Sequence, residues 1–417
     1  MPISRRTLLA GGAGLGLATL PGCGTNTGRG GGGSGPRLAQ WYHQYGEPGT
    51  RQAVERYAAA YKVADVGVEW RPGNYDQQTA AALLTDSGPD VFEVAGPTID
   101  QIQGGQVADL TALLGDAKDD FAPALLAPRT YRGRVWGIPQ LVDTQVLYYR
   151  RSLLQAAGVR PPQSLDELVD AARRLTRKDV KGLFLGNAGG AGALGGTPLY
   201  AAGLSLVTPD GRVGFDDPAA ARTLGKLHRL HTDGSLLLGA PTDWFNPAAF
   251  TQGLAAMQWC GLWALPQVRK ALGDDFGVLP FPPDGPAGRP AVPVGAWAAA
   301  VSSRSAHREA AEAYVKWLWV ERTDFQLDFA QSYGLHVPAR TSLAARADRL
   351  TSGAAADIVR FTKDHGWAVP LLWTAASQTA YLDALSRIIR EGADPAGELK
   401  AVARKAGAEL RRVRNHG

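Results

Sequence analysis

The chain has 417 residues, of which 45% are hydrophobic and 20% are charged, and its formal net charge is +5. This composition is typical of a folded globular protein, and no segment after the first 36 residues is long and apolar enough for a membrane-spanning helix. The positive charges are scattered. Their densest run, 404–414, indicates a solvated helix face, so we expect no nucleic-acid binding.

The chain opens with a paired arginine, Arg5 and Arg6, ahead of a short apolar run that ends at Leu20. Two arginines before such a run are typical of a twin-arginine export signal. The run is shorter than the roughly 20 residues that a spanning helix needs. We therefore expect a signal peptide over 1–22.

Cys23 lies just beyond this apolar run and resembles the cysteine in the lipobox of bacterial lipoproteins. That resemblance implies cleavage before Cys23 and a lipid on its side chain, so the exported protein would be anchored to the outer face of the cell membrane. A Gly/Ser-rich tether over 23–36 would follow. The alternative is a secreted protein in which this cysteine is incidental.

The second cysteine, Cys260, is then alone and lies among apolar residues, which predicts a buried free thiol. The sequence has no Cys-x-x-Cys pair. We expect no cysteine metal site, no redox dithiol and no cofactor.

Strand and helix patterns alternate from residue 38 onward, which predicts βαβ units and a parallel sheet covered by helices. The expected strands are 38–42, 66–70 and 89–94, and the expected helices between them are 50–61 and 75–84.

Further helices begin at recognisable caps. Ser164 and Glu167 have the spacing of a capping box, and Asp217 precedes a proline at a first helical turn. A strand over 294–301 follows the proline-rich stretch 280–293.

Four segments, in this order, resemble family 1 of the extracellular solute-binding proteins, the group that serves ABC importers and includes the maltose-binding proteins. They begin with Gly88-Pro89-Asp90-Val91-Phe92, Tyr131-Arg132-Gly133-Arg134-Val135-Trp136-Gly137-Ile138-Pro139, Phe250-Thr251-Gln252-Gly253-Leu254-Ala255-Ala256-Met257 and Gly277-Val278-Leu279-Pro280-Phe281-Pro282.

The resemblance implies a two-lobed α/β fold of the periplasmic-binding-protein type II, in which each lobe is a sheet flanked by helices and the ligand cleft lies between the lobes. We expect an N-lobe of 37–142 with 294–335 and a C-lobe of 143–293 with 336–417. The chain would cross between them near 138–144, 293 and 334–338. A few residues at such crossings can absorb a hinge closure around a ligand.

The resemblance also implies a carbohydrate ligand, mono- or oligosaccharide, and the permease subunits of an ABC importer as partners of a monomer. Aromatic rings stack on the C–H faces of sugars, while carboxylates and amides bind the hydroxyls. Trp263 and Asp143 match ligand-contacting positions of the maltose-binding proteins. The other candidates are Trp41, His43, Tyr45, Asp90, Glu93, Trp297, Tyr333, Arg340 and Trp373. For each of them a packing role is the competing interpretation.

The alternatives are an exported enzyme that acts on carbohydrate, a binding protein for a non-sugar solute, and a pure adhesion or scaffold role, which a closed or apolar cleft would favour. Residues 190–195 spell GxGxxG, although no clear helix opens on them, and His228 and His231 could share a metal with Asp233. The paired carboxylates at 119–120 and 274–275 have no visible partner for glycosidase chemistry. We expect no metal and no catalytic residue.

Overall fold

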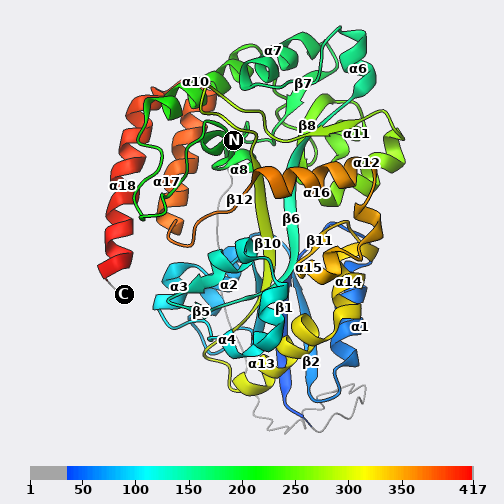
Figure 1. Ribbon diagram of the computed structural model, residues 1–417, viewed down its shortest axis with the longest axis vertical. Helices are drawn as coiled ribbons and strands as arrows, with labels where there is room; N and C mark the ends of the chain where they lie inside the picture. Colours follow the sequence, from blue (N-terminus) through cyan, green and yellow to red (C-terminus); the bar gives the residue numbers. More distant parts are fainter. Residues whose placement is uncertain (1–34, 416–417) are drawn as a thin grey trace, which may run out of the picture.

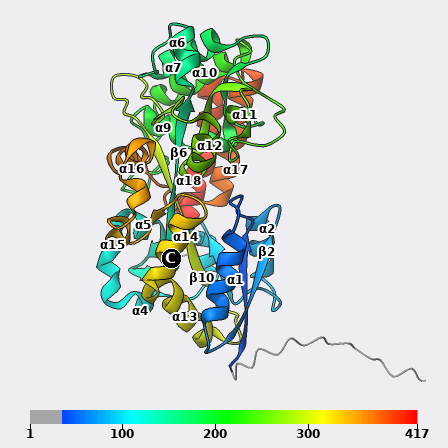
Figure 2. The same ribbon diagram turned by 90° about the vertical axis from the view of Figure 1, so that its right-hand side faces the viewer.

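The computed structural model describes residues 35–415, which form two lobes stacked along the long axis of the molecule (Figure 1). A view from the side shows the same two lobes joined through a waist that β6 and β10 cross (Figure 2). The expected signal peptide and most of the tether, with Arg5, Arg6 and Cys23, lie outside the described residues.

The lower lobe begins with the predicted alternation of strands and helices, and β1 pairs in parallel with both β2 and β3. The βαβ prediction is therefore confirmed. Parallel strands place their carboxyl ends at one edge of the sheet, and here that edge faces the upper lobe. The elements are β1 (Arg37–His43), α1 (Thr50–Ala60), β2 (Asp65–Arg71), α2 (Tyr75–Ala82) and β3 (Val91–Val94).

The lower lobe is completed by short helices, a two-stranded hairpin and two helices that return from later in the chain. These are α3 (Ile99–Gln103), α4 (Thr111–Leu114), α5 (Pro123–Leu126), β4 (Thr130–Tyr131), β5 (Arg134–Val135), α13 (Arg308–Lys316) and α14 (Thr323–Ser332).

Two long strands join the lobes, β6 (Ile138–Tyr149) and β10 (Val292–Val301). The sheet runs without interruption through both lobes in the order β2-β1-β3-β10-β6-β8-β7. The first half of β6 pairs with β10, and its second half pairs with β8 and β9. Most residues of β6 are buried, as expected for a strand covered on both faces.

The upper lobe packs helices around strands β7 (Lys181–Phe184), β8 (Ala255–Gly261) and β9 (Gly277–Leu279). Its helices are α6 (Arg151–Ala156), α7 (Leu165–Leu175), α8 (Ala191–Leu194), α9 (Thr197–Ala201), α10 (Pro218–Thr232), α11 (Ala248–Thr251), α12 (Leu265–Leu272), α16 (Gly353–His365), α17 (Ala375–Ser386) and α18 (Pro395–Asn415).

The third connection between the lobes contains β11 (Val337–Pro338), which pairs with β6, and α15 (Thr341–Ala344). The sequence placed the start of the last C-lobe segment at residue 336, but the chain still packs on the lower lobe for several residues after that. Ala339 belongs to the lower-lobe core, and the Ser342 hydroxyl donates to Asp120 at 2.5 Å. The strand β12 (Gly366–Trp367) pairs with β10 at the waist.

The hydrophobic cores are separate. The lower-lobe clusters draw on 38–142 and 296–339, whereas the upper-lobe clusters draw mainly on 146–292 and 347–410, with Leu335 as an early member. On this basis we keep the predicted lobe ranges as a proposal, with the start of the last C-lobe segment moved past α15.

The helix caps follow the sequence in part. The Ser164 hydroxyl accepts from the Glu167 amide at 3.2 Å, as predicted, but the Glu167 carboxylate accepts from the Gln163 amide and not from that of Ser164. Asp217 caps α10 through the Ala219 amide at 2.7 Å.

Two further expectations can be compared with the structure. Cys260 is a buried free thiol, as predicted, and burial raises its pKa to about 12. Among residues 35–415, none of the helices combines the length and hydropathy needed to cross a bilayer.

Candidate functional site

Both lobes line a cavity of about 500 Å³ at the waist, which we call the interlobe pocket. The loop after β1, the crossing strands β6 and β10, the turn 244–247 and the start of α12 contribute to it. The lining residues are His43, Gln44, Tyr45, Gly46, Glu47, Gly73, Ala95, Asp143, Gln145, Trp244, Phe245, Asn246, Pro247, Trp263, Ala264, Gln267, Pro293, Gly295, Ala296, Trp297 and His336.

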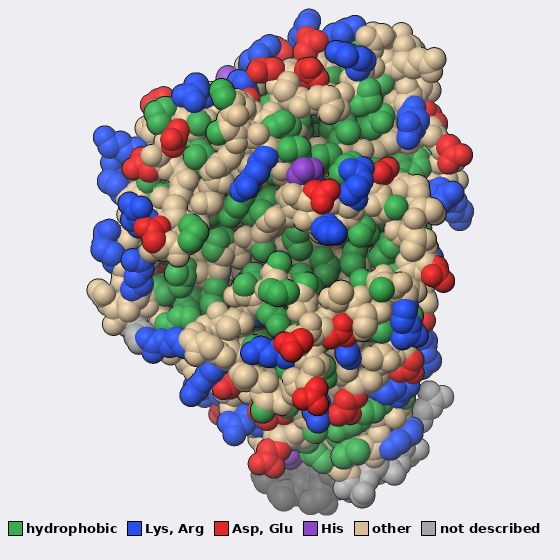
Figure 3. Space-filling view, in the orientation of Figure 1, with side chains coloured by type: hydrophobic (Ala, Val, Ile, Leu, Met, Phe, Trp, Pro, Cys, Tyr) green, Lys and Arg blue, Asp and Glu red, His purple; other side chains and the backbone are tan. Residues whose placement is uncertain are grey.

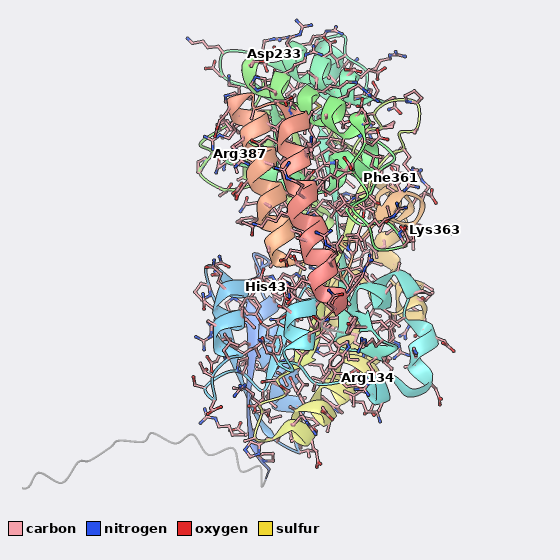
Figure 4. The ribbon with its side chains drawn as sticks, turned by 90° about the vertical axis from the view of Figure 1, so that its left-hand side faces the viewer. His43, Arg134, Asp233, Phe361, Lys363 and Arg387 are labelled. Atoms are coloured by element: carbon pink, nitrogen blue, oxygen red, sulfur yellow. The ribbon has the colours of Figure 1, made fainter. Side chains whose placement is uncertain are left out.

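Aromatic rings form the wall that the lower lobe contributes. The indole of Trp297 stacks on the His43 ring, with centroids 3.9 Å apart and planes 18° apart. Tyr45 packs against the other side of this pair, 3.9 Å from the His43 centroid. Figure 4 shows His43 at the upper edge of the lower lobe, where it faces the helices of the upper lobe.

A buried carboxylate, Glu93, fixes these rings from behind. It is 1% exposed, its Oε2 lies 2.6 Å from His43 Nδ1, and it accepts a hydrogen bond from the Tyr45 hydroxyl. Burial, and then the charge of Glu93, raise the pKa of Tyr45 well above its usual value, so the phenol stays protonated and donates. Glu93 therefore positions the wall and does not line the pocket.

A buried ion triad forms the floor beside the crossing strands. His336, which is 3% exposed, places Nδ1 2.5 Å from Asp143 Oδ1 and Nε2 3.3 Å from Glu47 Oε1. Burial alone would lower the pKa of His336, but the charges and hydrogen bonds of Asp143 and Glu47 outweigh it and raise the pKa to about 10. His336 is thus a cation at neutral pH, held between two carboxylates.

Asp143 lines the pocket with one carboxylate oxygen unpaired among the described residues. Within residues 35–415 no protein group hydrogen-bonds its Oδ2, while Oδ1 is taken by His336. Asp143 lies opposite Gly295 in the ladder between β6 and β10, so no side chain from that neighbour covers it. A free carboxylate oxygen on a cavity floor is suited to accept hydrogen bonds from ligand hydroxyls.

The upper lobe contributes a second aromatic wall. The Trp263 indole donates to the Phe245 carbonyl at 2.8 Å and meets the Trp244 ring edge-on, with centroids 6.0 Å apart. The buried amide of Gln258 holds this turn, because it donates to the carbonyls of Trp244 and Asn246 at 3.2 and 2.8 Å. Phe245 is 56% exposed at the pocket mouth.

The structure brings together five of the predicted ligand residues on the lining of the interlobe pocket: His43, Tyr45, Asp143, Trp263 and Trp297. Glu93 lies behind them. Trp373 lines a neighbouring hollow and donates from its indole to Gln378 at 2.6 Å.

Two predicted residues of the first strands lie inside the lower lobe. Trp41 belongs to a buried cluster beneath α2, with the Arg71 guanidinium 3.7 Å from its ring centroid. Asp90 precedes β3 and therefore lies at the opposite end of the sheet, where it accepts from the Ala39 amide at 2.7 Å. Neither lines the pocket.

Two predicted residues of the third connection also have structural partners. The Tyr333 hydroxyl accepts from Arg56 at 2.9 Å, and its ring approaches Gly49 so closely that a Cβ there would lie 2.7 Å away. Arg340 pairs with Asp120 at 2.7 Å and donates to the Val320 carbonyl. Both were predicted to contact ligand, and the structure places both outside the pocket.

Sequence reasoning missed His336, Glu47, Trp244, Phe245 and the supporting Gln258. Trp244 and Phe245 had a signal, since they stand directly before Asn246 and Pro247, which are residues typical of turns. His336 had none, because its carboxylate partners are far away in the chain.

Some of the residues considered for an enzyme have structural partners. In the described part of the chain no three His, Cys, Asp or Glu side chains could hold a metal. His228 Nδ1 lies 2.9 Å from the Ile389 carbonyl, and Asp275 pairs with Arg150 at 2.7 Å. The glycines at 190–195 do open a helix, contrary to our expectation, but α8 is only one turn long.

Together, the two lobes, their crossing strands and the pocket between them define a two-lobed binding-protein fold. The family model described as bacterial extracellular solute-binding protein matches residues 47–319, more than half of the chain. The chain belongs to this family.

Curated relatives are similar over parts of the chain. The diacetylchitobiose binding protein of Streptomyces coelicolor is 26% identical over 36% of this chain and 37% of its own length. The maltooligosaccharide ABC transporter solute-binding lipoprotein of Streptococcus pneumoniae is 25% identical over 44% of this chain and 42% of its own length. The chain thus spans less than half the length of these relatives.

Solved structures share the fold over nearly the whole chain. The solute-binding protein of Thermotoga lettingae bound with α-D-tagatose has a TM-score of 0.76 at 19% identity and covers 90% of this chain and 100% of its own. UgpB of Mycobacterium tuberculosis, in complex with glycerophosphocholine, has a TM-score of 0.75 at 21% identity, with coverages of 91% and 99%. At these identities the likeness establishes the fold alone.

Proposed function

We propose that the protein captures a neutral carbohydrate in the interlobe pocket and delivers it to the permease subunits of an ABC importer. The observation that carries this is the arrangement of the lining. Aromatic faces from both lobes, Trp297 below and Trp263 above, enclose a floor with the free Oδ2 of Asp143. Opposed rings and a few directed acceptors are what sugar recognition requires.

The charge of the lining favours a neutral ligand. The described lining has two carboxylates, Glu47 and Asp143, and no lysine or arginine. A phosphate or uronate would find only His43 and His336 as basic side chains of the described lining, and both are already paired with carboxylates. This argues against an anionic solute, although a relative of the same fold carries glycerophosphocholine.

The ligands of relatives support the same class. The partial relatives are named for diacetylchitobiose and maltooligosaccharide, and the Thermotoga structure holds tagatose. We assign this chain to the same class, as a binding protein without catalytic activity and as a monomer. The alternative of an exported enzyme that acts on carbohydrate gains no support, and three of its candidate residues, His228, Asp275 and Asp120, have structural partners.

Export and anchoring belong to the same proposal. Arg5 and Arg6 would direct export and Cys23 would carry a lipid, so that the tether holds the two lobes at the outer face of the membrane. The pneumococcal relative is itself named a lipoprotein.

A thermal-shift panel of mono- and oligosaccharides tests the function. A sugar at a hundredfold excess over its dissociation constant should stabilise the protein by about 2.7 kcal/mol through mass action, and the melting temperature should rise accordingly. Protein unfolded and refolded to remove carried-over ligand is the required starting material. The absence of any shift across the panel would contradict the proposal.

A further inference from the structure

A second cavity of about 350 Å³ adjoins the interlobe pocket, and we call it the side pocket. It lies between the loop that leads into α3 and the segment that leads into α17. In Figure 1, α17 stands above α3 on the left of the waist. The two cavities share three lining residues, Ala95, Gly295 and Ala296, so a ligand in one borders the other.

The side pocket differs from its neighbour in chemistry. Its described lining has no carboxylate and consists mainly of aliphatic side chains and prolines. These are Ala95, Pro97, Ala124, Leu125, Pro128, Val294, Ala296, Ala368, Val369, Pro370, Leu371 and Ala375. The space-filling view also shows hydrophobic side chains gathered around the waist of the molecule (Figure 3).

Most polar groups of this lining are already engaged. Arg129, which is 3% exposed, donates from its Nη atoms to the carbonyls of Leu125, Ala95 and Ala296, the first at 2.7 Å. Its Nε is buried and has no protein partner in the described chain. The Thr98 hydroxyl accepts from the Gln101 amide at the cap of α3.

The aromatic member of this lining is engaged as well. The Trp373 indole donates to Gln378, and its ring packs on Phe215 and Tyr381 in the upper-lobe core. Trp373 therefore offers the side pocket an apolar surface and no hydrogen-bond donor. A sugar ring, which needs several polar partners, would find little here beyond the Gln378 side-chain amide, and most of its hydroxyls would be left unpaired.

One exposed side chain also indicates that the side pocket offers an apolar surface. Val369 is 47% exposed, and large hydrophobic side chains with this degree of exposure are few in the described chain. Two of them, Phe245 at the interlobe pocket and Val369 at the side pocket, lie on the walls of adjoining cavities. Apolar surface left open beside a binding site is suited to cover an apolar part of the ligand.

We propose that the ligand is a glycoside with an apolar aglycone, whose sugar occupies the interlobe pocket and whose aryl or alkyl group occupies the side pocket. This inference rests on the proposed function, because it requires that the interlobe pocket binds a sugar. It narrows the ligand class from carbohydrates in general to sugars that carry a hydrophobic substituent.

Calorimetric titration with matched glycosides tests the inference on the full chain. The probes are methyl, phenyl and 4-carboxyphenyl glycosides of glucose, galactose, mannose, xylose and N-acetylglucosamine, in both anomers. For the sugar that binds, we expect the phenyl glycoside to bind at least tenfold more tightly than the methyl glycoside, because the ring buries apolar surface. The carboxyphenyl glycoside should lose that gain.

A matched pair of variants locates the effect. Val369→Asp should abolish the phenyl advantage and leave the affinity for the methyl glycoside unchanged. Val63→Asp, at an exposed valine of the lower lobe outside both cavities, should change neither. Both positions are exposed, so the fold should tolerate both changes.

The outcomes distinguish the proposed sugar-binding function from the proposal that the side pocket binds an apolar aglycone. Equal affinities for methyl and phenyl glycosides, or tighter binding of the carboxyphenyl glycoside, would overturn the inference while leaving the sugar-binding function intact. Failure of every glycoside and every sugar to bind would overturn the proposed function, and this inference with it.

Discussion

At the scale of single residues, two carboxylates that the sequence marked as candidate ligand contacts have different roles. Glu93 is enclosed and uses its oxygens on His43 and Tyr45, whereas Asp143 lines the pocket, uses Oδ1 on His336 and leaves Oδ2 without a protein partner in the described chain. The first positions an aromatic wall, and the second is available to a ligand. Their three-dimensional neighbours account for this difference.

The triad around His336 predicts a pH dependence of stability. The folded-state pKa of about 10 is above the usual value of 6.5, so the charged histidine stabilises the fold. This stabilisation is fully present below pH 6.5 and is lost as the pH rises through 10. The free energy of unfolding, measured by urea denaturation at a series of pH values, should fall across this window.

The variant His336→Gln checks the origin of that fall. It leaves Glu47 and Asp143 without their cation, so we expect a loss of about 3–5 kcal/mol at pH 7. The pH dependence between 6.5 and 10 should flatten in this variant. If His336→Gln keeps the wild-type pH dependence of the free energy of unfolding, that dependence arises from other groups.

The placement of the candidate residues follows from strand direction. His43 ends β1 and so reaches the cleft, while Asp90 precedes β3 and lies at the far end of the sheet. The sequence contained this distinction, because parallel strands direct only their carboxyl ends to a ligand edge. The partners of His336 could not be predicted, since Asp143 is 193 residues away.

At the scale of elements, local signals predicted the strands, the helices and the start of α10, because caps and alternation depend on neighbouring residues. The third connection was less predictable. Its course depends on contacts between distant segments, such as Arg340 with Asp120 and Val337 with Val142. No periodicity in the sequence records those contacts.

Gly334 allows the packing of the third connection against the His336 triad to be tested. A Cβ at Gly334 would lie 2.6 Å from His336 Nε2 and 2.9 Å from Glu47 Oε1. Gly334→Ala should therefore displace the triad and lower the free energy of unfolding by about 1–3 kcal/mol, which chemical denaturation would measure.

A matched glycine serves as the control. Gly192, in α8, has open space around its hypothetical Cβ and no positive φ. Gly192→Ala should be neutral or slightly stabilising, since alanine favours a helix over glycine. Equal effects at both positions would show that the close approach at Gly334 does not matter.

At the scale of the whole molecule, each lobe has its own core, and the contacts across the waist are few and specific. Besides the crossing strands, the last turn of α18 reaches the lower lobe. Arg412 pairs with Asp100 at 2.8 Å, and Gln103 donates to the Val413 carbonyl at 2.8 Å. These contacts bound the cleft on the side of the side pocket.

The central claim is that the ligand is held by both lobes at once. The most direct measurement is a calorimetric titration of Trp263→Ala and Trp297→Ala with the sugar that stabilises the wild type. One tryptophan belongs to each lobe, so each variant should lose about 10- to 100-fold in affinity. Trp317→Ala, which removes a half-buried lower-lobe indole outside the pocket, should keep wild-type affinity. Unchanged affinity in either cleft variant, with the fold intact, would contradict the account.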